Sequence, residues 1–291
     1  MSMSGIATMW IRDGVLVDRM HINPVAFAFA ALSFALADTP TPAVEELIQF
    51  AFAKSGYSFA EKLQLYNHEV AKIVADVHAA ARYYNQLATA AAQACQPFPG
   101  AVELLAELKS RGVHSFITSA VEQELMDMWS ESSDGQPLTQ QLDEVLGRRT
   151  DFSKGRDHFA YVHTKYKPER IYLIADAPAE IGMGRQFAEE FSIIAIGFGN
   201  VIDQAKVAQG YDIVRKSWLD LDVKGDALPS YQSIASSLRD NLRLDDLHLP
   251  DESQIVKNLT VAGADHVVSG SGSELMSELS RFFKHQLKPD S

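Results

Sequence analysis

The sequence predicts an α/β fold in which an all-helical lobe is inserted into a doubly wound parallel sheet. Three observations carry this prediction. Short apolar strands alternate with helices over the second half of the chain. A long run of helical sequence separates the first strand from that alternation. Acidic or hydroxyl residues end several of the strands, and ligands of such sheets bind at the carboxyl ends of the strands.

The first expected strand covers residues 6–11 and runs into an acidic turn at 12–18. The sequence then becomes helical from about residue 23 to residue 94, with many Ala, Leu, Phe and Glu residues and few β-branched runs. Turn-forming residues interrupt it at Thr39–Pro42 and Ser55–Gly56. This stretch is far too long for a single crossover helix, and we therefore expect a separate lobe.

Strand–helix alternation resumes after the Pro97–Gly100 turn. Gly112 is placed to end one helix, and Pro178 to begin another. The expected helices cover 101–111, 122–129 and 156–166, and the expected strands cover 113–118, 144–146, 171–175 and 191–196. Two further strand–helix endings follow, at 210–221 and 263–285.

This organisation predicts three parts. Residues 1–18 and 97–221 are expected to form the α/β core, and residues 19–96 the helical cap. Residues 222–291 form a C-terminal extension of unassigned role, for which packing on the core is one option.

Composition limits the partners of the chain. The 291 residues are 46% hydrophobic, which is ample for a core, and 38 Asp and Glu against 26 Lys and Arg give a formal charge of −12. Such an acidic surface repels nucleic acid and anionic membranes. Cys95 is the only cysteine, so no disulfide forms within the chain. The sequence shows neither a secretory leader nor an apolar run of about 18 residues, and we expect a cytoplasmic protein.

The turn after the first strand, IRDGVLVD at residues 11–18, resembles the first motif of the haloacid dehalogenase (HAD) superfamily. That motif reads Asp-x-Asp-Gly-(Thr/Val)-Leu-x-Asp, and its first Asp is the nucleophile. Ile11 occupies this position, and Asp13 occupies the position of the general acid. The resemblance covers about residues 6–221 and implies the capped, phosphatase-like branch of the superfamily.

Further residues match the later motifs of this superfamily, in chain order and at strand ends. The resemblance implies that Thr118, with Ser119, binds phosphate, and that Lys154 neutralises the developing charge. It also implies that Asp176 and Glu180 hold magnesium together with the first motif. Hydroxyl, ammonium and carboxylate groups suit this chemistry, because phosphoryl transfer needs charge clamps and a bridging cation.

Ile11 breaks this scheme twice, because its side chain can neither attack phosphorus nor give a carboxylate oxygen to the metal. Loss of a catalytic nucleophile typically lowers the rate about a million-fold. We therefore expect Mg²⁺, held by Asp13, Asp176 and Glu180, to bind only weakly. Arg12 is expected to point away from Ile11 and Asp13, toward the lobe or solvent. A contact between Arg12 and a bound anion is the less favoured alternative.

Other candidate residues are discounted. His158 and His163 are five residues apart, which is not the one-face spacing of a zinc pair, and they are interpreted as surface or core residues. Gly197-x-Gly199 follows a strand but lacks the third glycine of a dinucleotide fingerprint.

Three hypotheses on function remain. The first is a HAD-like hydrolase homologue that has lost aspartyl-phosphate catalysis and binds a small phosphorylated or anionic metabolite, or acts as a regulatory or interaction protein. The alternative is an active Mg²⁺-dependent phosphatase-type hydrolase in which Asp13 is the general base for a water. The third is a non-catalytic assembly module that forms a homo-oligomer through the tail at 223–291.

Overall fold

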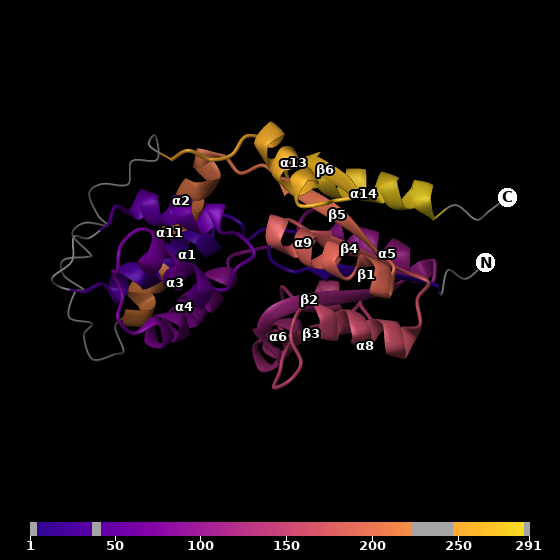
Figure 1. Cartoon of the computed structure of the whole chain (residues 1–291), viewed down its shortest axis with the longest axis horizontal. Coiled ribbons are helices and arrows are strands. Elements are labelled where there is room, and N and C mark those ends of the chain that lie inside the picture. Colours follow the sequence, from indigo (N-terminus) through magenta and orange to yellow (C-terminus); the bar gives the residue numbers. More distant parts are fainter. Residues whose placement is uncertain (1–4, 37–41, 223–246, 288–291) are drawn as a thin grey trace. The chain divides into compact units, whose positions relative to one another are not determined.

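The computed structural model describes residues 5–36, 42–222 and 247–287. These residues form two compact units (Figure 1). The α/β unit contains residues 5–18, 96–201 and 250–287, and the helical unit contains residues 19–36, 42–95, 202–222 and 247–249.

The α/β unit is built on a parallel sheet, which confirms the predicted fold class. Within the described residues its strand order is β3-β2-β1-β4-β5-β6. The strands are β1 (Ile6–Ile11), β2 (His114–Glu122), β3 (Glu144–Arg148), β4 (Arg170–Ala175), β5 (Ile193–Asn200) and β6 (His266–Gly270), and each neighbouring pair is parallel. The two central strands, β1 and β4, are almost entirely buried, because helices cover both faces.

Alternate residues of β4 show the two covered faces. Tyr172 packs its ring against Phe282 and Phe283 of one helix, with ring centroids 6.0 and 5.6 Å apart. Leu173 points the other way, and a Cβ added at Gly184 would lie 2.7 Å from its Cδ2 atom. The helices of this unit are α5 (Ala101–Ser110), α6 (Gln123–Ser130), α7 (Gln136–Thr139), α8 (Arg156–Tyr166), α9 (Pro178–Gln186), α10 (Ala188–Phe191), α13 (Glu252–Val261) and α14 (Ser273–Gln286).

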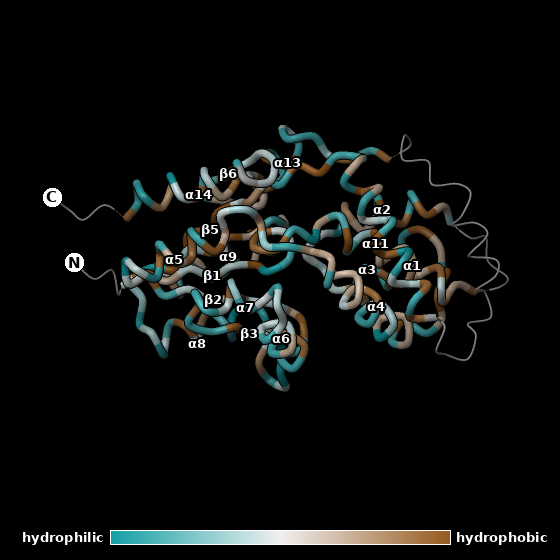
Figure 2. Tube along the Cα trace, turned by 180° about the vertical axis from the view of Figure 1, so that it is seen from behind, coloured by the Kyte–Doolittle hydropathy of each residue, from teal (hydrophilic) through white to brown (hydrophobic). Residues whose placement is uncertain are grey.

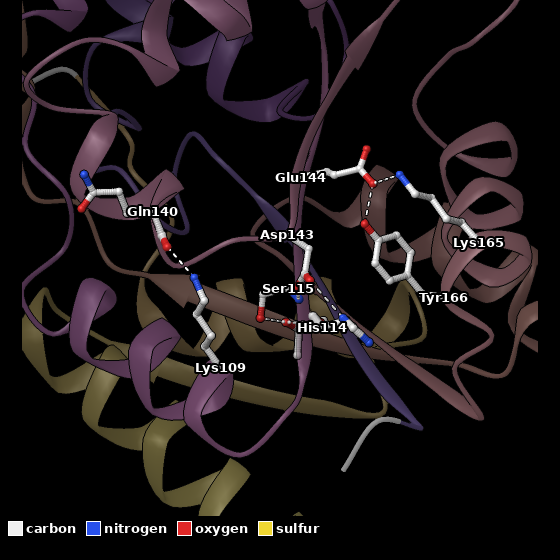
Figure 3. Close-up of polar contacts among 9 residues, drawn as sticks. Lys109, His114, Ser115, Gln140, Asp143, Glu144, Lys165 and Tyr166 are labelled. Carbon is white, nitrogen blue, oxygen red and sulfur yellow. Dashed lines mark hydrogen bonds and ion pairs between the residues drawn. The ribbon is translucent and has the colours of Figure 1, made fainter. Parts of the chain in front are cut away.

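Polar contacts fix the amino ends of β2 and β3 (Figure 3). The main-chain N–H of Ser115 donates to Asp143 Oδ2 at 2.8 Å, and the His114 ring lies 3.0 Å from the other oxygen of Asp143. Glu144 accepts hydrogen bonds from Lys165 and Tyr166 of α8, both at 2.5 Å. These contacts hold α8 against the start of β3, at the end of the sheet opposite to the predicted site.

The helical unit contains α1 (Asn23–Ser33), α2 (Val44–Ala53), α3 (Phe59–Glu69), α4 (Val77–Ala92) and α11 (Gln204–Asp222). Residues 202–221 were expected in the α/β core, and this boundary is wrong. The segment 210–214 is also helical rather than a strand. The physical reason is that Tyr211 and Trp218 of α11 pack their rings on Phe29 of α1, and the Trp218 indole donates to Ser33 Oγ at 3.1 Å.

The last part of the chain completes the α/β unit. In β6, Val267 is paired with Gly197 of β5, while α13 and α14 cover that edge of the sheet. The described part of the expected extension from residue 250 onward therefore belongs to the core. Residues 223–246 of that extension lie outside the described residues.

Hydropathy alternates along the helices of both units (Figure 2), which is typical of amphipathic helices with one buried face. In α14, for example, Leu275, Leu279 and Phe283 are four residues apart and all buried. No helix in the described part of the chain is both long enough and apolar enough to cross a membrane.

Candidate functional site

The predicted site residues lie in the α/β unit. Asp13 and Asp176 follow the carboxyl ends of β1 and β4, and Lys154 lies in the segment between β3 and α8. Thr118 was expected to end its strand, but it lies inside β2, level with the last residue of β1.

A tight turn follows β1. The main-chain N–H of Gly14 donates to the carbonyl of Val17 at 2.8 Å, and the N–H groups of Leu16 and Val17 both donate to the carbonyl of Arg12. Gly14 has a φ of 91°, a conformation that glycine adopts without strain. The turn therefore fixes the main chain around Asp13.

Ile11 is the last residue of β1 and is 6% exposed. It is paired with Thr118 of β2 in the sheet. The structure therefore places a buried hydrocarbon beside Thr118, at the position that the motif resemblance assigns to the nucleophile. No atom of this side chain can form a covalent intermediate with phosphorus.

Arg12 is buried and binds the neighbouring carboxylate. Its Nε donates to Asp13 Oδ1 at 2.7 Å, and its Nη2 donates to Oδ2 at 3.0 Å. On α6, the Sδ of Met126 lies 3.1 Å from Nη1, and the ring of Trp129 lies 5.2 Å from the guanidinium carbon. The prediction that Arg12 faces the lobe or solvent is therefore wrong. Residue 12 already belongs to the turn, so strand alternation no longer sets the direction of its long side chain.

Thr118 has a partner that the sequence analysis missed. Its hydroxyl lies 2.8 Å from Nδ1 of His158 in α8, and both side chains are buried. Burial lowers the pKa of His158 from its ordinary value of 6.5 to about 4, and the nearby charge of Lys154 adds to this effect. The nearby main chain of Gly147 has the opposite effect on this pKa. The imidazole is therefore neutral near pH 7, and it engages the hydroxyl that the motif assigns to phosphate binding.

No motif pointed to His158. It does lie on the buried face of α8 with Phe159 and Val162, which is a signal of burial but not of a contact with Thr118. Ser119, the other predicted phosphate ligand, is also buried and accepts a hydrogen bond from the main-chain N–H of Val121 at 3.2 Å.

Lys154 and Glu180 form an ion pair with little exposure to solvent. Lys154 precedes α8, and the next residue, Gly155, has a φ of 109°. This conformation favours glycine, and a Cβ at Gly155 would also lie 2.9 Å from the sulfur of Met183, which would have to shift. Glu180 lies in the first turn of α9, and its Oε2 atom is buried without a hydrogen-bond partner.

Asp176 immediately follows β4. Burial of its carboxyl group, and then the negative charge of Glu180, raise its pKa well above the ordinary value. Lys154 opposes the increase and Asp13 adds to it. Asp13, Lys154 and Glu180 therefore all lie near enough to Asp176 for their charges to influence its pKa.

These carboxylates do not fit a magnesium ion as they stand. Magnesium takes an octahedron of oxygen ligands, including one or two carboxylates. Both oxygens of Asp13 accept from Arg12, and one oxygen of Glu180 accepts from Lys154. In the part of the chain that the structure describes, no group of three or more His, Cys, Asp or Glu residues is arranged to hold a metal ion.

Known protein families offer no sequence match. No family model matches the chain, and no curated protein is similar enough in sequence to match it.

Solved structures do match over nearly the whole length. A HAD family hydrolase from Deinococcus radiodurans, determined with bound phosphate and sodium, is 15% identical, with 99% of this chain and 100% of that chain covered and a TM-score of 0.54. A candidate phosphoglycolate phosphatase from Lactobacillus delbrueckii is 14% identical, with 97% and 98% covered and a TM-score of 0.51. A candidate β-phosphoglucomutase from Thermotoga maritima is 14% identical, with 95% and 99% covered and a TM-score of 0.52.

At this level of identity the likeness establishes the fold. The chain has the fold of HAD-like hydrolases, as the motif at 11–18 predicted. A fold alone does not carry an activity, so function must be argued from the site.

Proposed function

We propose that this chain is a HAD-fold protein that has lost phosphoryl transfer and that either binds a small phosphorylated or anionic ligand or acts as a regulatory or interaction protein. One observation carries the proposal: Ile11, at the carboxyl end of β1 and beside Thr118, occupies the position from which the fold's motif attacks phosphorus. A buried isoleucine removes the covalent step outright.

The state of the remaining polar groups supports the same conclusion. Asp13 is held by Arg12, Thr118 contacts His158, and Lys154 is paired with Glu180. Each group that the motifs assign to substrate, proton or charge therefore has a partner within the protein. An active phosphatase site needs such groups to be available to the phosphate and to the leaving oxygen.

The alternative of an active hydrolase requires Asp13 to act as a general base on water. A base must come within hydrogen-bond reach of the proton that it removes. Both Asp13 oxygens accept from the buried guanidinium of Arg12, and that guanidinium is packed on α6. The geometry thus favours the non-hydrolytic proposal, because the alternative needs Arg12 to move first.

The negative net charge of the chain disfavours some classes of binding partner. A formal charge of −12 disfavours nucleic acid and anionic membranes. We propose a small phosphorylated or anionic metabolite as the ligand, with Arg12 and Lys154 as the cations that it would contact at this edge of the sheet. Such a ligand must displace Asp13 or Glu180 from them, so we expect modest affinity.

Screening a panel of phosphate esters and phosphonates with Mg²⁺ tests the proposal. We expect no release of phosphate above background, and the same background for Asp13→Ala. The proposal would be contradicted if the wild type turned over a phosphate ester at the rate of ordinary phosphatases and the Asp13→Ala variant lost that activity.

A further inference from the structure

We infer that the Arg12 guanidinium takes the place of a divalent cation at Asp13, so that internal cations neutralise Asp13 and Glu180 and the site binds no Mg²⁺. The inference goes beyond the proposed function, because it concerns what balances charge at the site and not whether an ester is hydrolysed.

Arg12 and Asp13 form a bidentate ion pair. With N–O distances of 2.7 and 3.0 Å, each oxygen of Asp13 already accepts one charge-assisted hydrogen bond, which a metal ion would have to share or displace. A guanidinium is permanently charged, so it also repels a divalent cation that approaches the same carboxylate. Arg12 thus disfavours metal binding at Asp13 by occupying one acceptor site on each oxygen and by charge repulsion.

Contacts with α6 fix the position of the Arg12 side chain, which is largely shielded from solvent. The side chain is 7% exposed, its Nη1 is 3.1 Å from Met126 Sδ, and its guanidinium carbon is 5.2 Å from the centre of the Trp129 ring. A guanidinium stacks well on an aromatic face, and this contact strengthens where water is excluded. The helix therefore holds the cation in place.

Lys154 is the second internal cation of the site. Lys154 pairs with Glu180, and their side chains are 13% and 9% exposed. Ile11 supplies no oxygen where the motif would place a further carboxylate. Magnesium, which loses its water ligands reluctantly, would have to compete with internal cations for Asp13 and Glu180, two of its three predicted carboxylate ligands.

Calorimetric titration with MgCl₂ tests the inference on purified, full-length protein. We expect no binding to the wild type in the millimolar range and no shift of its melting temperature with Mg²⁺ or EDTA. In an Ile11→Asp background, which restores the missing carboxylate, the additional change Arg12→Gln should tighten Mg²⁺ binding by about tenfold or more. Arg148→Gln in the same background is the control, since Arg148 forms an exposed pair with Glu122, and it should leave binding unchanged.

Either of two results would overturn the inference: sub-millimolar binding of Mg²⁺ to the wild type, or equal affinity with and without Arg12 in the Ile11→Asp background. If the variants do not fold, an NMR measurement on the wild-type protein still tests the inference. The Nε–H proton of Arg12 should exchange slowly with solvent by NMR, and MgCl₂ should not change its exchange rate. Acceleration by Mg²⁺ would show that the cation displaces the guanidinium.

Discussion

At the residue scale, the site is a set of polar groups that bind one another. Asp13, Thr118 and Glu180 each have an internal partner, namely Arg12, His158 and Lys154 respectively. Charge-assisted contacts in a partly buried environment are stronger than those at a surface. We therefore expect these residues to contribute to stability more than to chemistry.

His158 gives a pH-dependent prediction. Its pKa is about 4 in the folded protein against an ordinary 6.5, so the unfolded chain binds the extra proton first as pH falls. Stability contributed by the neutral ring is present above pH 6.5 and is lost between pH 6.5 and about 4. The loss amounts to up to about 3 kcal/mol.

Urea unfolding at a series of pH values measures this effect. His158→Gln, which keeps a polar group for Thr118, should flatten the stability curve over that window. An unchanged slope in the variant would contradict the assignment.

Ile11→Asp gives a second prediction. The change removes buried hydrocarbon and places a carboxylate near Asp13 and Asp176, so it should lower the free energy of unfolding by about 3 kcal/mol. Phosphatase activity should stay absent, because Arg12 still holds Asp13. Ile11→Val, which keeps the site apolar, is the control and should cost about 1 kcal/mol. Restored turnover in Ile11→Asp alone would show that Arg12 does not block the site.

The sequence predicted part of this site and missed the rest for physical reasons. The order of the motifs predicted that Asp13, Lys154 and Glu180 lie near one end of the sheet, because parallel strands end on the same side. The structure pairs Lys154 with Glu180. The direction of Arg12 was wrong because alternation applies to strands and not to the turn. His158 was missed because its contact with Thr118 joins α8 to β2, two elements far apart in sequence.

At the element scale, α11 shows how a local pattern misleads. The residues at 210–214 were read as a strand, but Tyr211, Val214 and Trp218 are three and four residues apart, which is the spacing of one helical face. Their burial in the helical unit depends on α1. That partner lies about 180 residues earlier in the chain, so no short window of sequence reveals it.

Trp218 tests this packing. Trp218→Ala removes a buried indole that contacts Phe29 and Ser33, and it should lower the free energy of unfolding by about 3–5 kcal/mol. Leu219→Ala on the same helix is the matched control, since Leu219 is exposed, and it should cost under about 0.5 kcal/mol. Equal effects in urea unfolding would contradict the placement of α11.

Glu144 tests how α8 is attached to β3 (Figure 3). Burial raises the pKa of Glu144, but hydrogen bonds from Lys165, Tyr166 and Tyr161 outweigh it and lower the pKa below the ordinary 4.5. The stability that the carboxylate adds is present above that value and is lost as pH falls through the lowered pKa. Glu144→Gln should cost about 1 kcal/mol at pH 7 and should reduce the acid sensitivity of unfolding. A variant that is as stable as the wild type at pH 7 would contradict this role.

At the scale of the whole molecule, the chain keeps the fold of HAD-like hydrolases while its first motif carries an isoleucine. The parallel sheet, the inserted helices and the edge where polar residues gather were all readable from strand–helix alternation and from one long helical interruption. The assignment of 202–222 to the helical unit, and of the chain from residue 250 to the core, was not readable, because both follow from long-range packing. The proposed loss of phosphoryl transfer rests on the site and not on this architecture.

The most direct test mixes concentrated wild-type protein with acetyl phosphate and MgCl₂, quenches the reaction in acid, and measures intact mass together with released phosphate. The account predicts no phosphoryl adduct on the protein and phosphate release equal to that of Asp13→Ala. A phosphorylated side chain between residues 11 and 13, or phosphate release that disappears in Asp13→Ala, would contradict it.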